Sequence, residues 1–405
     1  MASQSGKNIQ VAMRVETAFN TAVTTATGFT QIRLTGSPGL SQKKALINSA
    51  EVRSDGLHTI ARHGSQHIEG SFNGEMSVGG HDKIYEAAMR GTWATATTFT
   101  QAGSASLVSV AASVSNVINF GGGSIITQGL RVGDIFRITG STLALAVNLR
   151  AKTVAAASVQ CYGAPFAAIA TATTTFTMTI LRKLINPATP TKRSFKVEKY
   201  NTDIDLSQQF NGVKWTGFAI KGTPEGMAEV TFNALGASVS MIATAASPTF
   251  SSPTLPTGAP LVFADAVISQ NGVDLAVATA FDLTYALTAK TEPVVGTSFS
   301  PDVFDNDASL EGTISVIRQD LANFTAFNAE STFDLHILLT VPGTAPLDCI
   351  SIFVPYCKFT DVTGPLGADG AIIDTMKWTA GKKEGFSTTG YDDTLLTICT
   401  SAVGT

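Results

Sequence analysis

Apolar and polar residues alternate along most of this chain, and this is the pattern of half-buried β-strands. The clearest case is 68–78, where Ile68, Phe72 and Met76 share one face and polar residues fill the other. The same pattern predicts further strands at 29–34, 134–139, 176–181, 213–220, 228–233, 281–287, 333–339 and 349–354. Helix signals occur only at 81–93 and 318–332. The sequence therefore predicts a mainly β fold.

One strand opening occurs twice in the chain. Residues 67–78 read HIEGSFNGEMSV, and residues 309–316 read SLEGTISV, so an apolar residue, Glu-Gly and a hydroxyl residue begin both strands. Each strand leads to a helix near an aspartate, Asp82 or Asp320, and then to a further strand, at 175–183 or 332–340. The shared order predicts two tandem copies of one unit.

The copies and the segments between them predict five parts of the chain. Turn residues in "QNGV" at 270–273 also predict a hairpin within the second copy. The first copy begins at 1–95 and resumes at 175–244; an inserted, separately folding small β-barrel-like domain lies between them at 96–174. A linker rich in Pro, Ser and Thr follows at 245–260, and the second copy with a C-terminal arm occupies 261–405.

Composition narrows the class of protein. Charged residues make up 14% of the chain while 44% is hydrophobic, so the chain is not of the disordered type. A net charge of −4 argues against a nucleic-acid-binding protein, which normally carries a basic patch. We find no signal-peptide pattern and no run of about 18 uncharged apolar residues that would predict a membrane span. Sparse charge on many strands suits a protein that buries surface against copies of itself.

Candidate chemical groups are few. His58, His63, His67 and His81 lie close in sequence, but their spacing fits no metal motif, and a solvated polar face is the expected location. The carboxylate pairs Asp203/Asp205 and Asp392/Asp393 are expected on the surface. The four cysteines, without a CxxC pair, are expected to be reduced and buried. The chain has no G-x-S-x-G elbow or phosphate loop. The sequence thus predicts no catalytic, cofactor-binding or metal-binding residue, and no enzymatic activity.

The stretch 51–93 resembles the major tail tube proteins of long-tailed bacteriophages and prophages. It carries that family's R-S-D turn, E-G-S strand, D-x-φ-φ-E-A helix and final Gly-x-Trp. These positions are Arg53, Ser54, Asp55, Glu69, Gly70, Ser71, Asp82, Ile84, Tyr85, Glu86, Ala87, Gly91 and Trp93. Residues 210–236 also look like that family's later core strands.

The resemblance implies a β-sandwich or half-barrel unit flanked by one helix and assembled into stacked rings. These rings would form the tail tube, the channel for genome delivery, in a siphovirus-type virion assembled in the host cytoplasm. The implied partners are further copies of the chain, the tape measure protein, viral double-stranded DNA without specific binding, and terminator and tip proteins at the tube ends. No membrane is implied. Two copies per chain predict a trimeric ring with pseudo-sixfold symmetry, and they place the inserted domain on the exterior.

Glu69, Glu75 and Glu311 are the predicted lumen-facing charges, because carboxylates on polar strand faces would repel DNA weakly and let it slide. The alternative for these residues is a solvated outer face or pairing with a neighbouring subunit. Two alternative functions also stay open: another tail or neck ring (terminator or distal tail), or a tail-tip receptor-binding or hydrolase protein.

Overall fold

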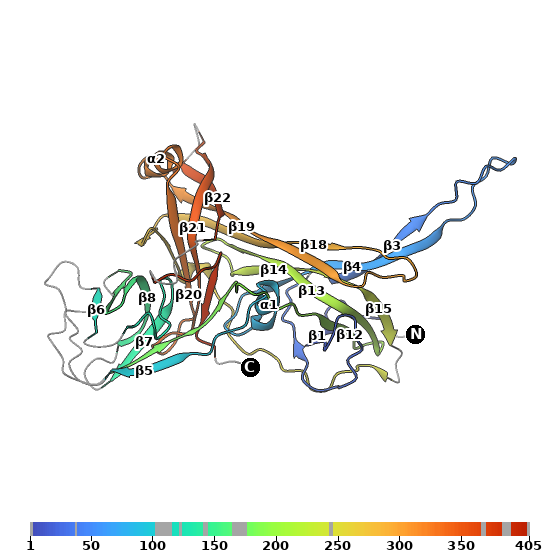
Figure 1. Cartoon of the computed structure of the whole chain (residues 1–405), viewed down its shortest axis with the longest axis horizontal. Helices are drawn as coiled ribbons and strands as arrows, with labels where there is room; N and C mark the ends of the chain where they lie inside the picture. The colour runs from blue at the N-terminus through green and yellow to red at the C-terminus, as the bar shows by residue number, and fades with distance from the viewer. Residues whose placement is uncertain are drawn as a thin grey trace.

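A computed structural model describes residues 3–36, 39–101, 116–120, 124–140, 145–163, 176–242, 246–365, 370–382 and 390–402. Strands form 52% of the chain and helices 5%, which confirms the predicted mainly β class. The strands belong to two antiparallel sheets, one of 17 strands and one of six (Figure 1). The three consecutive glycines at 121–123, whose sequence predicts a loop, lie outside the described residues.

The large sheet is built from two groups of strands, one on each side of the 246–260 segment. The first group is β1 (Ile9–Val15), β2 (Thr30–Gln31), β3 (Gly39–Ile47), β4 (Arg62–Glu75), β11 (Arg182–Ile185), β12 (Phe195–Asn201), β13 (Leu206–Gly222), β14 (Glu229–Gly236) and β15 (Ser238–Ile242), with helix α1 (Asp82–Ala88). The second is β16 (Ala266–Gln270), β17 (Val273–Asp274), β18 (Ala278–Thr291), β19 (Val303–Ile317), β20 (Thr332–Thr340), β21 (Cys349–Thr363), β22 (Ile373–Ala380) and β23 (Thr397–Thr400), with helix α2 (Ala322–Asn328).

Apart from β11, which pairs with β23 of the second group, the two groups have the same strand topology. The first contains the pairs β1–β2, β1–β12, β12–β13, β13–β14, β13–β15, β14–β4 and β4–β3. The second contains β16–β17, β16–β20, β20–β21, β21–β22, β21–β23, β22–β19 and β19–β18, in the same arrangement. Each of these pairings in the first group therefore has a counterpart in the second, and we refer to the two groups as the first and the second copy.

Small irregularities of the backbone coincide as well. The β3–β4 register shifts between Lys44 and Leu46, and the β18–β19 register shifts at the counterpart position, between Leu287 and Ala289. β13 and β21 shift in the same way at Trp215/Gly217 and at Phe359/Asp361. A bulge changes the side of the sheet on which the following side chains lie. Because the bulges are at matched positions, equivalent residues of the two copies lie on the same side of the sheet.

The repeated Glu-Gly opening has a steric cause. A Cβ at Gly70 would lie 2.1 Å from the carbonyl oxygen of Gly39, and a Cβ at Gly312 would lie 2.3 Å from that of Asp282. Gly39 and Asp282 occupy equivalent positions in β3 and β18, the strands that precede β4 and β19. Glycine is needed at both places because the neighbouring strand approaches closely there.

The two helices occupy equivalent places but are buried differently. Ile84, Tyr85, Ala87 and Ala88 of α1 are buried, and the Tyr85 ring lies 5.1 Å from that of Phe218 in β13. Both predicted helices are shorter than expected. Arg90 (φ 53°) and Glu330 (φ 52°) take left-handed backbone conformations two residues beyond the last helical residue. No described residue of α2 is buried.

Three sequence expectations need correction. The strand expected at 29–34 is only the two-residue β2. On one side its backbone hydrogen-bonds to Thr254, in the irregular segment after β15, and not to a second long strand. Residues 176–180 form β10, which belongs to the six-stranded sheet, so that sheet extends past the expected boundary at 174. The first-copy counterpart of β20 is consequently β12, since β12 pairs with β1 and β13 as β20 pairs with β16 and β21.

The expected hairpin is present, and the segment expected to be a linker is irregular and packs against the body. β16 and β17 pair through a turn at Asn271 and Gly272, both with positive φ. Residues 246–260 are irregular, but they are not free of the body: Phe250 is buried, with its ring 5.7 Å from that of Phe29. Residue 245 lies outside the described part of the chain.

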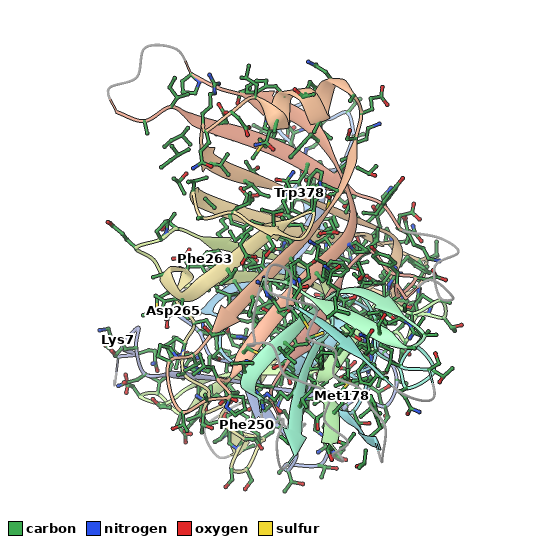
Figure 2. All side chains as sticks on the ribbon, turned by 90° about the vertical axis from the view of Figure 1, so that its left-hand side faces the viewer. Lys7, Met178, Phe250, Phe263, Asp265 and Trp378 are labelled. Atoms are coloured by element: carbon green, nitrogen blue, oxygen red, sulfur yellow. The ribbon has the colours of Figure 1, made fainter. Side chains whose placement is uncertain are left out.

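The six-stranded sheet has the order β5-β10-β7-β8-β9-β6 and lies against the second copy. Its strands are β5 (Thr97–Gln101), β6 (Val117–Asn119), β7 (Ile135–Gly140), β8 (Leu145–Ala155), β9 (Ser158–Cys161) and β10 (Phe176–Ile180). Figure 1 shows it beside β20, at the end of the molecule far from the long β3–β4 arm, and Figure 2 shows Met178 within it.

This inserted sheet shares its core with the second copy. Phe353 of β21 packs into the hydrophobic cluster of the inserted sheet, while Ile135 of β7 packs with Leu338 and Cys349 of the second copy. The side chains of Arg137 and Asn148 both donate to the carbonyl oxygen of Leu347, at 3.0 and 2.7 Å. The insertion is therefore packed into the body, in contrast to the expected separately folding domain.

An ion-pair cluster joins the inserted sheet to the rest of the chain. Lys183 Nζ of β11 lies 2.9 Å from a carboxylate oxygen of Asp134 and 2.8 Å from one of Asp392. Asp134, which precedes β7, is fully buried, and this burial raises the pKa of its carboxyl to about 6. The two neighbouring carboxylates in turn raise the pKa of Lys183. Each charge in the cluster thus depends on the others for its stability.

Candidate functional site

One face of the large sheet is polar across both copies. Eight strands follow one another in the order β3-β4-β14-β13-β18-β19-β22-β21. Their apolar side chains face the core and α1, and the alternate residues face the other way. The uncharged polar residues of this face are Ser41, Ser71, Asn73, Thr231, Asn233, Thr284, Thr313, Ser315, Thr375 and Thr379. We refer to this face, together with its charged residues, as the polar face.

The structure places Glu69, Glu75 and Glu311 together on the polar face. Glu69 lies opposite Ser41 and Leu235, and Glu75 lies opposite Glu229. Glu311 is the second-copy counterpart of Glu69 and lies opposite Thr284 and Thr379. The Glu69 carboxylate is 3.5 Å from Lys43 Nζ and 3.4 Å from His67 Nε2, and about half of its side chain is exposed.

Further charged residues of the polar face were missed by the sequence analysis. The acidic ones are Glu229, Asp282 and Asp361, and the basic ones are Lys43, Lys221 and Lys377. Their strands were mostly predicted, so strict alternation along each strand could have identified Glu229 and Asp282. Six carboxylates against three ammonium groups give the polar face a net negative charge.

The histidines do not form a site. The described residues contain no group of three or more His, Cys, Asp or Glu side chains that could hold a metal ion. His58 and His63 are exposed and His67 is partly exposed, as expected. His81 is buried, so its expected solvated position was wrong: its ring lies 5.1 Å from Phe232, and its Nε2 is 3.3 Å from the carbonyl oxygen of Arg33. This burial lowers the pKa of His81 to about 4.

Acid should destabilise the unassembled protein through His81. The imidazole has a pKa near 6.5 in the unfolded chain and about 4 when folded, so the unfolded state binds more protons between these values. Stability is then lost as the pH falls through this window, by about 3 kcal/mol at its acidic end. Burial of His336 acts in the same direction. Urea unfolding at pH 7 and pH 4.5 should show a smaller acid loss for His81→Gln than for wild type or the exposed control His58→Gln; equal losses would contradict this account.

The carboxylate pairs have structural roles. Asp203 accepts hydrogen bonds from the Ser5 backbone N–H at 2.7 Å and from the Asn8 side chain at 2.8 Å, which holds the N-terminal segment. Asp205 accepts a hydrogen bond from the Tyr200 hydroxyl at 2.8 Å. Asp392 belongs to the Lys183 cluster, so it is not the solvated surface residue that was expected.

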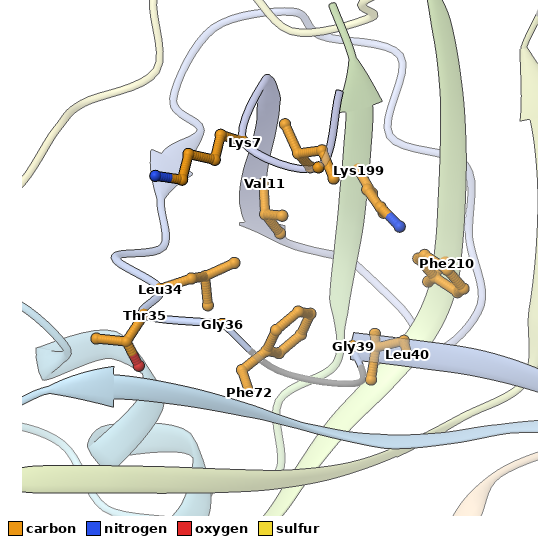
Figure 3. A pocket seen from close by; sticks show the side chains of 12 residues that line it. Lys7, Val11, Leu34, Thr35, Gly36, Gly39, Leu40, Phe72, Lys199 and Phe210 are labelled. Carbon is orange, nitrogen blue, oxygen red and sulfur yellow. The ribbon is translucent and has the colours of Figure 1, made fainter. Parts of the chain in front are cut away.

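A cavity of about 470 Å³ lies between the N-terminal segment and β3 (Figure 3). Apolar side chains such as Leu34, Leu40, Phe72 and Phe210 line it, together with Lys7 and Lys199. None of the described lining residues is a carboxylate, histidine or cysteine, so they offer no acid–base pair or metal ligand for catalysis. All four cysteines of the chain are buried with free thiols, as expected.

The long sheet edges are surfaces on which strands of further chains can pair. The family model described as phage tail tube protein matches residues 6–380. The chain therefore belongs to the phage tail tube protein family, which confirms the resemblance read from the sequence. This family gives the protein a structural role and places it in the virion tail. No curated protein matches the chain. Within its described residues, no helix has the length and apolar character needed to cross a membrane.

Proposed function

We propose that this protein assembles into rings that stack into the tail tube, and that the tube is the channel for genome delivery. The observation that carries the proposal is the identical strand topology of the two copies, joined edge to edge in one sheet through β13 and β18. A contact that repeats around an axis closes into a ring. The joined copies are two successive units of such a ring.

The ring contains three chains. Each chain supplies two units with the same pairings, so three chains give six units and pseudo-sixfold symmetry. Rings then stack along the axis, and terminator and tip proteins bind at the ends of the tube.

The polar face lines the lumen. It lies on the side of the sheet opposite to the core and α1, and the inserted sheet is then on the exterior. The excess of carboxylates over ammonium groups disfavours retention of DNA, because DNA binds proteins mainly through Lys and Arg. Double-stranded DNA and the tape measure protein occupy this lumen without specific binding. The tail is of the non-contractile type, and its tube assembles in the host cytoplasm.

Assembly of the purified protein tests this function. We expect rings or tubes at high concentration in negative-stain microscopy, and a ring mass of three chains by mass photometry. Six chains per ring would contradict the trimer. Rings that never stack would indicate a terminator instead of a tube protein. A monomer at all concentrations, together with hydrolase activity on glycans, would overturn the proposed function.

A further inference from the structure

The joint between the two copies is a strand pairing with charged contacts around it. Gly217–Gly222 of β13 pair antiparallel with Phe281–Ala286 of β18, and Phe218 stacks on Tyr285 with ring centroids 5.3 Å apart. Lys214 Nζ lies 2.6 Å from an Asp302 carboxylate oxygen. We call this set of contacts the internal joint.

Asp305 of the second copy adds a second charged contact to the internal joint. Its carboxylate lies 3.4 Å from Arg90 and 2.8 Å from Lys192. Arg90, two residues beyond α1, is thereby held to the start of β19, so the internal joint fixes the helix region as well as the sheet.

The two strands equivalent to those of the internal joint are edges in the single chain. The counterpart of β18 is β3, and the counterpart of the C-terminal half of β13 is Asp361–Thr363 of β21. Among the described residues, β3 pairs only with β4, and Asp361–Thr363 pair only with β22. The free edges lie at the two ends of the eight-strand order, so each chain carries one half of the joint at each end.

The matched bulges fix which residues would meet if these edges paired as β13 and β18 do. Gly217 corresponds to Asp361, and its partner Ala286 corresponds to Lys43. By the same correspondence Val362 meets Gln42. An uncharged pair inside the chain is thus replaced by opposite charges at the free edges. Both charged side chains are about half exposed in the single chain, where Asp361 contacts Lys377 and Lys43 contacts Glu69.

The second charged contact of the internal joint has a complementary counterpart too. Arg90 corresponds to Glu330 after α2, and Asp305 corresponds to His63 of β4. The helix side carries the cation Arg90 within the chain, whereas at the free edge it carries the acid Glu330, opposite an imidazole. Glu330 and His63 are both exposed, and Glu330 contacts Lys358 Nζ at 2.7 Å within the chain.

The exposure of α2 agrees with a missing neighbour. Ala87 of α1 and Leu287 of β18 line one small cavity at the internal joint, and Ala87 is buried. The counterpart of Ala87 is Phe327 of α2, which is 37% exposed. A second chain that paired with β21 as β18 pairs with β13 would cover Phe327 as the second copy covers Ala87.

We infer that rings close by pairing the β21 edge of one chain with the β3 edge of a second copy, in the register of the internal joint. Asp361 of one chain then lies opposite Lys43 of the next, Val362 lies opposite Gln42, and Glu330 faces His63. This inference rests on the proposed ring assembly and names its closing contact. The acid on the helix side, at Glu330, also distinguishes the closing contact from the internal joint, where the helix side carries Arg90.

A double-cysteine variant tests the register directly. Side chains directly opposite in antiparallel strands have Cβ atoms about 4.5–5.5 Å apart, close enough for a disulfide after a small adjustment. Assembled Gln42→Cys, Val362→Cys protein should give intermolecular disulfides on oxidation, and non-reducing gels should show a ladder that ends at three chains. The matched control Gln42→Cys, Thr363→Cys is shifted by one residue, which puts the thiols on opposite faces, and should cross-link about tenfold less.

Charge exchange provides the second measurement. Lys43→Asp or Asp361→Lys alone should raise the concentration needed for assembly about tenfold, because like charges then face each other. The two changes in one chain should restore assembly, since every closing contact again joins opposite charges.

The outcomes separate this inference from the proposed function. Wild-type rings that show neither selective cross-linking nor charge rescue would overturn the closing contact and leave the ring itself intact. A ladder that ends at six chains would support the contact and overturn the trimer. Failure of the wild-type protein to assemble at any concentration would overturn both.

Discussion

Replacing Lys183 with methionine should lower the free energy of unfolding of the unassembled protein by about 3–5 kcal/mol. The ammonium group lies within 3 Å of both Asp134 and Asp392, at 2.9 and 2.8 Å. Its removal leaves the fully buried Asp134 carboxylate without a compensating charge. Asp134 belongs to the inserted part of the chain and Lys183 to β11 of the large sheet. Removing the contact between them therefore also weakens the attachment of the inserted sheet to the rest of the chain.

Urea unfolding of the unassembled variants measures this effect. Lys377→Met is the matched control, since Lys377 is 62% exposed and pairs with Asp361 at 3.3 Å; such exposed pairs contribute about 1 kcal/mol or less. Adding Asp134→Asn to Lys183→Met should recover part of the loss, because the uncompensated carboxylate is then gone. A Lys183→Met loss no larger than that of the control would show that the cluster is not coupled as described.

Tubes of the Glu69→Lys, Glu311→Lys double variant should retain double-stranded DNA that wild-type tubes release. Both residues lie on the polar face at equivalent places in the two copies, so the change adds positive charge at regular intervals around the proposed lumen. Each Lys–phosphate contact releases condensed counterions, so retention should be strong at low salt and fall steeply as salt rises. Virions that carry the variant should eject their genomes more slowly.

The control for this prediction has the same net charge in another place. Glu225→Lys, Glu292→Lys changes two exposed turn residues outside the polar face and should leave DNA release unchanged. Electron microscopy establishes that the variant tubes form before DNA retention is measured over a salt series. If the Glu69/Glu311 variant fails to assemble while the control assembles, these glutamates are partners in subunit contacts, and the lumen assignment is wrong.

Alternation of apolar and polar residues predicted the strands well, because a strand with one buried face needs an apolar residue at every second position. Ile68, Phe72 and Met76 are buried as that period requires. Alternation carries no information about which strands pair. The placement of β10 in the inserted sheet and the β13–β18 contact depend on pairings between residues far apart in the chain, and neither was predicted.

The candidate surface shows the same division between local and long-range information. The alternating neighbours of Glu69 and Glu75 showed on which side of β4 these residues lie. The repeated Glu-Gly opening placed Glu311 in an equivalent position. The negative character of the whole face arises from strands of both copies lying side by side. His81 was misplaced because its burial results from Phe232 packing against it across the fold, a contact that its sequence neighbours Gly80 and Asp82 do not indicate.

Carrying both copies on one polypeptide changes how tube formation can begin. The internal joint forms during folding at the effective concentration set by the chain itself, which for short connections reaches about the millimolar range. The proposed ring of three such chains needs two association steps between separate molecules before it closes, where six single-copy subunits would need five. Nucleation of the first ring therefore depends on a lower power of the subunit concentration, so tubes should be able to start early in infection, while little of the protein has been made.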